Sequence, residues 1–224
     1  MDTEIKERLE RLRAELPASV KLVAVSKFHP VEVLRAAYDA GQRVFGESRV
    51  QELVSKHEAL PGDIEWHFIG HLQQNKVKYI APFVRLIHAV DSLKLLAEID
   101  KQARRCDRVI PCLLQLHVAA EESKYGFTPE ECRAMLSGGE WRELHHVAIV
   151  GMMCMATNTY DTERVRRDFH DAYLFYKEAK RDFFAQCPAF HERSWGMSHD
   201  YPLAIQEGAT IVRIGTNIFG PREY

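Results

Sequence analysis

Residues 21–30 read KLVAVSKFHP, a short apolar run that ends at a lysine and is soon followed by a proline. Val23 and Val25 are β-branched, which favours a strand, and Pro30 can occupy the first turn of a helix. The run therefore predicts a buried strand that leads into a helix, with the amine of Lys27 at the strand end.

Lys27 has two interpretations at this position. An amine beside an apolar strand end is partly desolvated, so it loses its proton more readily and can attack an aldehyde to form a Schiff base. Most surface lysines, however, are simply solvated. The run by itself leaves both interpretations open.

Seven more apolar runs follow the first strand and alternate with helical patterns. With Leu22–Val25, the expected strands are 43–45, 66–69, 86–90, 109–118, 147–153, 192–197 and 211–214. The helical stretches between them are 31–40, 49–60, 92–105, 129–136, 162–184 and 201–207. Their lengths suit the crossovers that join parallel strands.

Eight strands with such connections predict a single-domain (β/α)₈ barrel over residues 1–224. Several runs are continuously apolar, as expected when both faces of a sheet are covered. Ile5, Leu9, Leu12 and Leu16 mark one face of an extra N-terminal helix that ends before Pro17. An open doubly wound sheet is the alternative, but no Gly-x-Gly-x-x-Gly follows the first strand.

Composition narrows the classes of partner. The 224 residues are 46% hydrophobic, enough for one sizeable core, and 30 basic against 32 acidic residues give a net charge of -2. No long charge block suggests a nucleic-acid or membrane surface, and no segment resembles a signal peptide or a membrane span. Five widely spaced cysteines indicate reduced thiols. We expect a cytoplasmic protein that binds a small molecule or another protein.

Polar and glycine residues follow several of the expected strands. In a barrel these positions share the C-terminal rim, where active sites lie, and a phosphate site often follows the seventh and eighth strands. Glycine lets a backbone approach an anion, and hydroxyl and N–H groups donate to it. The pattern predicts a phosphate site at Ser198, Gly215 and Thr216. The alternative is that Gly215 only makes a turn.

Motifs along nearly the whole chain carry a family resemblance. They are 22–27 (LVAVSK), 45–47 (FGE) with 50–52 (VQE), 66–70 (WHFIG) with 72–73 (LQ) and 75–76 (NK), 123–124 (SK) with Gly126, 196–198 (GMS) with Asp200, and 212–215 (VRIG) with 218–220 (IFG). In this order they resemble the pyridoxal phosphate homeostasis protein family, also called the proline synthetase co-transcribed homologues. The resemblance implies the barrel domain of alanine racemase standing alone.

The resemblance also implies roles for particular residues. Lys27 would carry pyridoxal 5′-phosphate (PLP) as an internal aldimine, and Arg213 would face the pyridine nitrogen. A guanidinium keeps its proton, so the cofactor would be a poor electron sink. The remaining cofactor-binding residues would be Asn75, Met197, Ser198, Gly215 and Thr216.

The expected function is non-catalytic handling of PLP, by storage or by delivery to PLP-dependent apo-enzymes. The alternative is an amino-acid racemase. A racemase of this barrel type needs a second base, a tyrosine from an additional β domain, and the ten residues after Ile214 leave no room for that domain. A closed barrel needs no partner to cover its edges, so we expect a monomer.

Three positions depart from the usual family pattern. Ser48 and His117 stand where asparagine is common, and Trp195 follows Arg-Ser where Leu-Ser-Met is usual. These departures put in question only the contacts made by the second and fifth strands. A metal-dependent hydrolase using Glu65, His67 and His71 is a third hypothesis, weakened because a four-residue spacing pairs ligands on a helix but not across a strand end.

Overall fold

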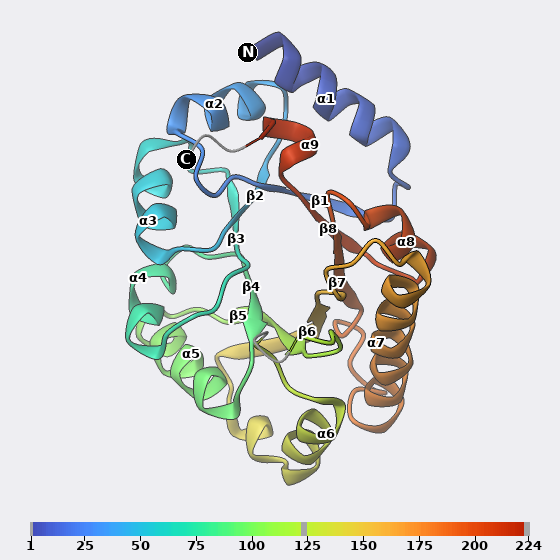
Figure 1. The fold of residues 1–224 in the computed structure, drawn as a ribbon. Helices are drawn as coiled ribbons and strands as arrows, with labels where there is room; N and C mark the ends of the chain where they lie inside the picture. Colours follow the sequence, from blue (N-terminus) through green and yellow to red (C-terminus); the bar gives the residue numbers. More distant parts are fainter. Residues whose placement is uncertain (1, 122–124, 222–224) are drawn as a thin grey trace.

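Eight parallel strands close into a barrel in the computed structural model, which describes residues 2–121 and 125–221 (Figure 1). The strands are β1 (Lys21–Val25), β2 (Val44–Glu47), β3 (Glu65–Phe68), β4 (Leu86–Val90), β5 (Ile110–Leu116), β6 (Val147–Cys154), β7 (Glu192–Met197) and β8 (Ile211–Ile214). Each pairs with its neighbours in chain order, and β8 pairs with β1. The predicted (β/α)₈ barrel is confirmed.

Helices surround the barrel on the outside (Figure 1). The longer ones are α1 (Asp2–Glu15), α2 (Val31–Asp39), α3 (Val50–Ala59), α5 (Leu93–Arg105), α6 (Pro129–Gly138) and α7 (Thr162–Asp182). The shorter ones are α4 (Val77–Ile80), α8 (Tyr201–Gln206), α9 (Thr216–Phe219) and the 3₁₀ turns η1 (Gln74–Lys76) and η2 (Glu140–Glu143). None of the described helices is long and apolar enough to cross a membrane.

The N-terminal helix α1 is the extra element expected from the sequence. Ile5, Leu9 and Leu12 are its buried residues, and the helix packs against α2 and α9 (Figure 1). Arg13 near its end donates to the carbonyl oxygen of Ala40 at 2.8 Å. Because α9 directly follows the last strand, α1 packs against the segment next to the closure of the barrel.

Two apolar layers make up the core. The larger layer lies between strands and helices, and the smaller one includes Val23, Leu86, Leu113, Met153 and Ile211, contributed by five different strands. The interior of an eight-stranded barrel is just wide enough for such side chains to fill it. These side chains fill much of the barrel interior, and in this fold a site is expected at the C-terminal mouth.

Two short helices were not predicted. The four-residue helices α4 and α9 occupy stretches that the sequence pattern treats as connections. Four residues make barely one turn and give no detectable hydrophobic period. The difference matters at α9, because its first residue, Thr216, belongs to the expected phosphate site.

Candidate functional site at the barrel mouth

Lys27 lies in the turn that follows β1, at the C-terminal mouth of the barrel, and is half-buried. It stands four residues beyond Val23, whose side chain fills the barrel interior and whose register partner on β8 is Arg213. The next residue, Phe28, has a φ of 69°, a left-handed conformation that is uncommon for a bulky side chain. Such a turn must be held by its surroundings.

A buried ion cluster holds this turn from behind. Lys56 Nζ on α3 donates to the carbonyl oxygen of Ser26 at 2.8 Å, to Glu47 Oε1 at 2.7 Å and to Glu52 Oε1 at 2.6 Å. Ser26 Oγ donates to Glu47 Oε1 at 2.6 Å, and the backbone N–H of Phe28 donates to Glu52 Oε1 at 2.6 Å. The residues on both sides of Lys27 are thus tied to one charged cluster.

Glu47 is a member of this cluster whose pKa is shifted by its surroundings. Burial raises the pKa of Glu47 to about 7, because the loss of hydration outweighs the attraction of the Lys56 ammonium. Its second oxygen, Oε2, is buried and has no hydrogen-bond partner among the described residues. A carboxyl group that titrates near neutral pH therefore lies directly behind the turn of Lys27.

The ends of β7 and β8 meet the end of β1 at the same mouth. The backbone N–H of Gly215 donates to Ser198 Oγ at 3.1 Å, and Asn217 Nδ2 donates to the carbonyl oxygen of Ser198 at 3.1 Å. A Cβ on Gly215 would lie 3.0 Å from the carbonyl oxygen of Val25, so this approach of two backbones favours glycine. The structure brings Ser198 and Gly215 to the strand end that precedes Lys27.

Arg213 lies below this junction, inside the barrel. It is 4% exposed, and its guanidinium donates to the carbonyl oxygen and the hydroxyl of Ser194 at 2.6 and 2.7 Å and to the carbonyl oxygen of Cys154 at 3.0 Å. Burial lowers the pKa of Arg213, yet a guanidinium keeps its proton in proteins. A fixed positive charge therefore lies beneath the mouth.

The other expected site residues lie at the rim. Met197 is half-buried, with its N–H donating to Asp200 Oδ1 at 2.5 Å, while Thr216 is exposed at the start of α9. Asn75 is exposed on η1, in the connection that follows β3. The structure therefore groups Met197 and Thr216 with Ser198 and Gly215, but it gives Asn75 no bonded link to them.

The three departures from the family pattern occupy different surroundings. Ser48 follows β2 and packs closely against Gly70. His117 follows β5, and its Nε2 bonds to the carbonyl oxygen of Glu121 at 2.9 Å. Trp195 is fully buried in the layer between strands and helices, so it does not line the barrel interior. The substitution at Trp195 thus acts on the packing of β7.

The metal-hydrolase hypothesis finds no support in the described part of the chain. His67 is buried and bonds through Nδ1 to His88 Nε2 at 2.9 Å, whereas His71 is exposed, stacks on Tyr125 and lies 3.1 Å from Asp91. No group of three potential metal ligands occurs among the described residues. Lys124, in the Ser-Lys motif, lies outside the described residues.

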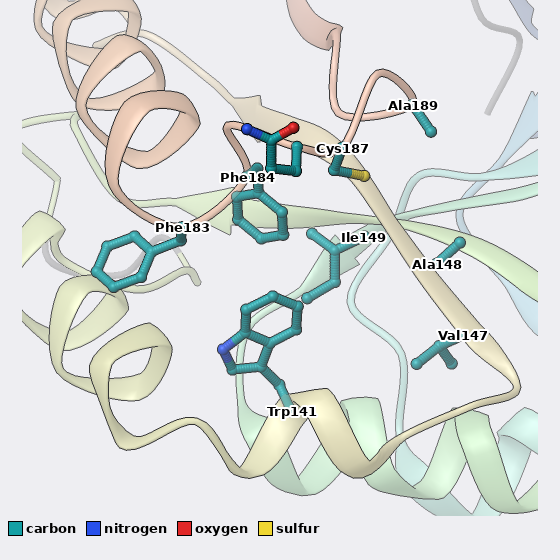
Figure 2. Close-up of a pocket in the computed structure, with 9 residues that line it drawn as sticks. Trp141, Val147, Ala148, Ile149, Phe183, Phe184, Cys187 and Ala189 are labelled. Atoms are coloured by element: carbon teal, nitrogen blue, oxygen red, sulfur yellow. The ribbon is translucent and has the colours of Figure 1, made fainter.

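A separate pocket lies at the opposite end of the barrel. Trp141, Ile149, Phe184 and Cys187 line it, near the start of β6 and before β7 (Figure 2). Its volume is about 350 Å³, and its walls are mostly apolar. This pocket lacks the cationic and hydroxyl donors that an anion requires, so the mouth around Lys27 is the better candidate site.

Comparisons with known proteins place the chain in a family. Residues 3–223 match the family described as "Alanine racemase, N-terminal domain". The pyridoxal phosphate homeostasis protein of Aquifex aeolicus is 43% identical over 205 residues, which are 91% of this chain and 88% of that protein. The chain belongs to the pyridoxal phosphate homeostasis protein family. The family resemblance read from the motifs is therefore confirmed.

Solved structures agree with this membership in the homeostasis protein family. PipY of Synechococcus elongatus is 40% identical and covers 96% of this chain and 100% of its own, with TM-scores of 0.89 without PLP and 0.85 with PLP bound. An alanine racemase of Clostridium difficile is 13% identical, with a TM-score of 0.78 over 96% of this chain and 56% of its own. At that identity the likeness concerns the fold alone.

Sequence reasoning missed the buried cluster behind Lys27 in this homeostasis-family chain. Glu52 and Lys56 are four residues apart on α3, which by itself predicts an ordinary exposed helix pair. Glu47 was noticed as part of a motif, without a role. The one available signal was the charge of Glu47 at the end of a strand that is otherwise apolar.

Proposed function

We propose that this chain binds pyridoxal 5′-phosphate through Lys27 and holds it for storage or delivery, without sustained catalysis. Two comparisons support the proposal: the Aquifex relative is named for pyridoxal phosphate homeostasis, and PipY is solved with PLP bound. The observation that carries it is the junction of β1, β7 and β8. There, Lys27 follows β1, and Ser198 bonds to Gly215 against the end of β1.

The donor set at this junction fits a phosphate monoester. Ser198 Oγ accepts from Gly215, so its own hydrogen can be donated to an anion. The N–H groups of Ile218 and Phe219 in α9 bond to the carbonyl oxygen of Gly215, whereas those of Thr216 and Asn217 precede the first such bond. Gly215 lets a ligand approach the backbone closely. Ser198, Gly215 and Thr216 would hold the phosphate, with Met197 beside them and Asn75 at the opposite edge.

Lys27 would hold the other end of the cofactor. When bound, PLP supplies an aldehyde that condenses with amines. The Nζ of Lys27 would be the amine that holds this aldehyde end. The cluster of Lys56, Glu47 and Glu52 would keep the turn of Lys27 in one conformation throughout.

Arg213 supports holding over catalysis. Its guanidinium is fixed by Ser194 and Cys154 and cannot give a proton to a ring nitrogen. A pyridine that stays unprotonated withdraws few electrons from a substrate. The proposed carrier would therefore activate amino acids poorly.

Borohydride reduction tests the attachment. The purified protein loaded with PLP should be yellow, and reduction should fix a phosphopyridoxyl group on Lys27, detected by peptide mass spectrometry. Lys27→Ala should lose the visible absorption, whereas Lys94→Ala, which removes an exposed lysine on α5, should keep it. A colourless protein that stays unlabelled with added PLP would contradict the proposal.

Transfer and turnover separate the possible roles. Mixing the loaded protein with an apo-enzyme that requires PLP should move the absorption to the acceptor if the role is delivery, and should leave it in place if the role is storage. Incubation with L-alanine should give no steady-state racemisation. Sustained racemisation would favour the racemase alternative. We also propose that the carrier acts as a monomer, which size-exclusion chromatography can check.

A further inference from the structure

A small cavity lies at the N-terminal end of the barrel, opposite the mouth of Lys27. Its volume is about 160 Å³, and its polar lining consists of Lys21, His67, Arg85, His191 and Glu192. Lys21 begins β1, Arg85 precedes β4 and His191 precedes β7. One water needs only about 10–15 Å³ of such volume, so the cavity has room for a small molecule.

His67 contributes an unpartnered polar atom to this cavity. The residue is 1% exposed, and its Nδ1 is 2.9 Å from His88 Nε2. Its other ring nitrogen, Nε2, is buried and has no hydrogen-bond partner in the part of the chain that the structure describes. A buried polar atom without a partner is costly, which points to a ligand that is not part of the chain.

The hydrogen-bond network decides whether this atom donates or accepts. Arg213 can only donate, and it donates to Ser194 Oγ at 2.7 Å. Ser194 Oγ keeps its own hydrogen and lies 2.9 Å from His88 Nδ1, and His88 Nε2 lies 2.9 Å from His67 Nδ1. When the Ser194 hydroxyl donates to His88 Nδ1, His88 donates from Nε2 to His67 Nδ1. This direction leaves the hydrogen of a neutral His67 on Nε2, so the atom is a donor.

Both histidines are neutral in this chain of bonds. Burial lowers the pKa of His67 to about 3 and lowers the pKa of His88 well below its ordinary value. The charges of Lys21 and Arg85 lower the pKa of His67 further, which places both cations near it. His67 therefore offers an N–H group, and the cations offer charge.

The acidic group in the lining is already engaged. Glu192 accepts a hydrogen bond from Thr210 Oγ1 at 2.7 Å, and its other oxygen lies 3.5 Å from His191 Nε2. Arg85 has a loose contact of 3.8 Å with Glu65, and its side chain is 63% exposed. Arg85 therefore keeps donor capacity for a ligand, and the exposed Lys21 adds an ammonium as a second donor at the same cavity. A ligand that accepts hydrogen bonds from these groups needs acceptor oxygens.

We propose that this cavity binds a small oxyanion, a carboxylate or an inorganic phosphate, through His67 Nε2–H, Lys21 and Arg85. The proposal rests on Ser194 donating to His88, a direction that the tautomer of His67 reports. The proposal does not depend on PLP binding, because none of the three donors lies at the mouth.

Nuclear magnetic resonance of ¹⁵N-histidine-labelled protein tests the proposal. Without added anion, the imidazole shifts of His67 should report a neutral ring with hydrogen on Nε2. Titration with phosphate or with acetate, at ionic strength held by chloride, should shift the His67 signals saturably. Saturation with phosphate alone or with acetate alone would identify the oxyanion, and both outcomes support the site.

Variants locate the binding. Lys21→Ala and Arg85→Gln change exposed side chains and should fold normally, and each should weaken the titration about tenfold or more, as the loss of one charge-assisted hydrogen bond implies. Lys94→Ala should titrate like the parent. Shifts that never saturate, a hydrogen on Nδ1, or unchanged affinity in Lys21→Ala would each overturn the proposal. The last result would place the bound phosphate at the opposite mouth.

Discussion

Replacing Lys56 by methionine should destabilise the protein strongly and in a pH-dependent way. The side chain of Lys56 is 5% exposed and donates to Glu47, Glu52 and the carbonyl oxygen of Ser26. Methionine fills a similar volume without the amine. Removing one partner of a buried ion pair costs about 3–5 kcal/mol, because the other charge is left buried without compensation.

The pH dependence follows from Glu47. Its pKa is raised from 4.5 to about 7 in the folded protein, so the folded state holds a proton that the unfolded state has already lost. This carboxyl group therefore lowers the stability of the parent as the pH rises from 4.5 to about 7, and its contribution is constant above that. Without Lys56 the pKa of Glu47 rises further. The free energy of unfolding of the variant therefore keeps falling, by about 1.4 kcal/mol per pH unit above 7. The cost of Lys56→Met should then be ~1 kcal/mol larger at about pH 8 than at about pH 6.

Urea unfolding followed by circular dichroism at these two pH values measures both effects. Lys101→Met is the matched control, because Lys101 forms an exposed helix pair with Glu98 at 3.7 Å. Such a pair contributes at most about 1 kcal/mol, with little pH dependence in this range. A cost for Lys56→Met no larger than that of Lys101→Met, or a larger cost at the lower pH, would refute this account of the cluster.

Three further predictions concern single residues. Gly70→Ala should lower the free energy of unfolding by about 1–3 kcal/mol, because its Cβ would overlap the backbone of Ser48, and thermal unfolding checks this. Arg213→Met should cost about 1–3 kcal/mol for each buried acceptor that it leaves without a donor, again measured by urea unfolding. A thiol-reactive dye should label the half-buried Cys106 in the folded protein but reach Cys154 only after denaturation, since burial raises the pKa of the Cys154 thiol. Labelling of both at equal rates in the folded protein would contradict the last prediction.

Much of the fold could be predicted because its signals are local. Short apolar runs with β-branched residues predicted strands such as Leu86–Val90 and Ile211–Ile214 with their observed bounds. Helix-length connections then required parallel strands. The short helix α9 could not be predicted, because a single turn is too short to show a hydrophobic period. Thr216 at its start was predicted only as a residue of the phosphate site.

The candidate site divides in a similar way. The proximity of Ser198 and Gly215 could be predicted because a barrel brings every strand end to one rim. The hydrogen-bond network from His67 through His88 and Ser194 to Arg213 could not be predicted. Its members come from four strands, and His88 and Ser194 are 106 residues apart. No spacing rule along the chain links such residues.

Lys27 shows where the boundary lies. The sequence by itself determined that an amine follows the first buried strand and that glycine and hydroxyl residues follow the last two, since both are patterns of neighbouring residues. The closure of β8 against β1 decided that these groups lie together. Tertiary structure also decided that Lys56, an ordinary helix lysine in sequence, is buried against Glu47. Burial and charge depend on what packs across space, and only the folded barrel contains that information.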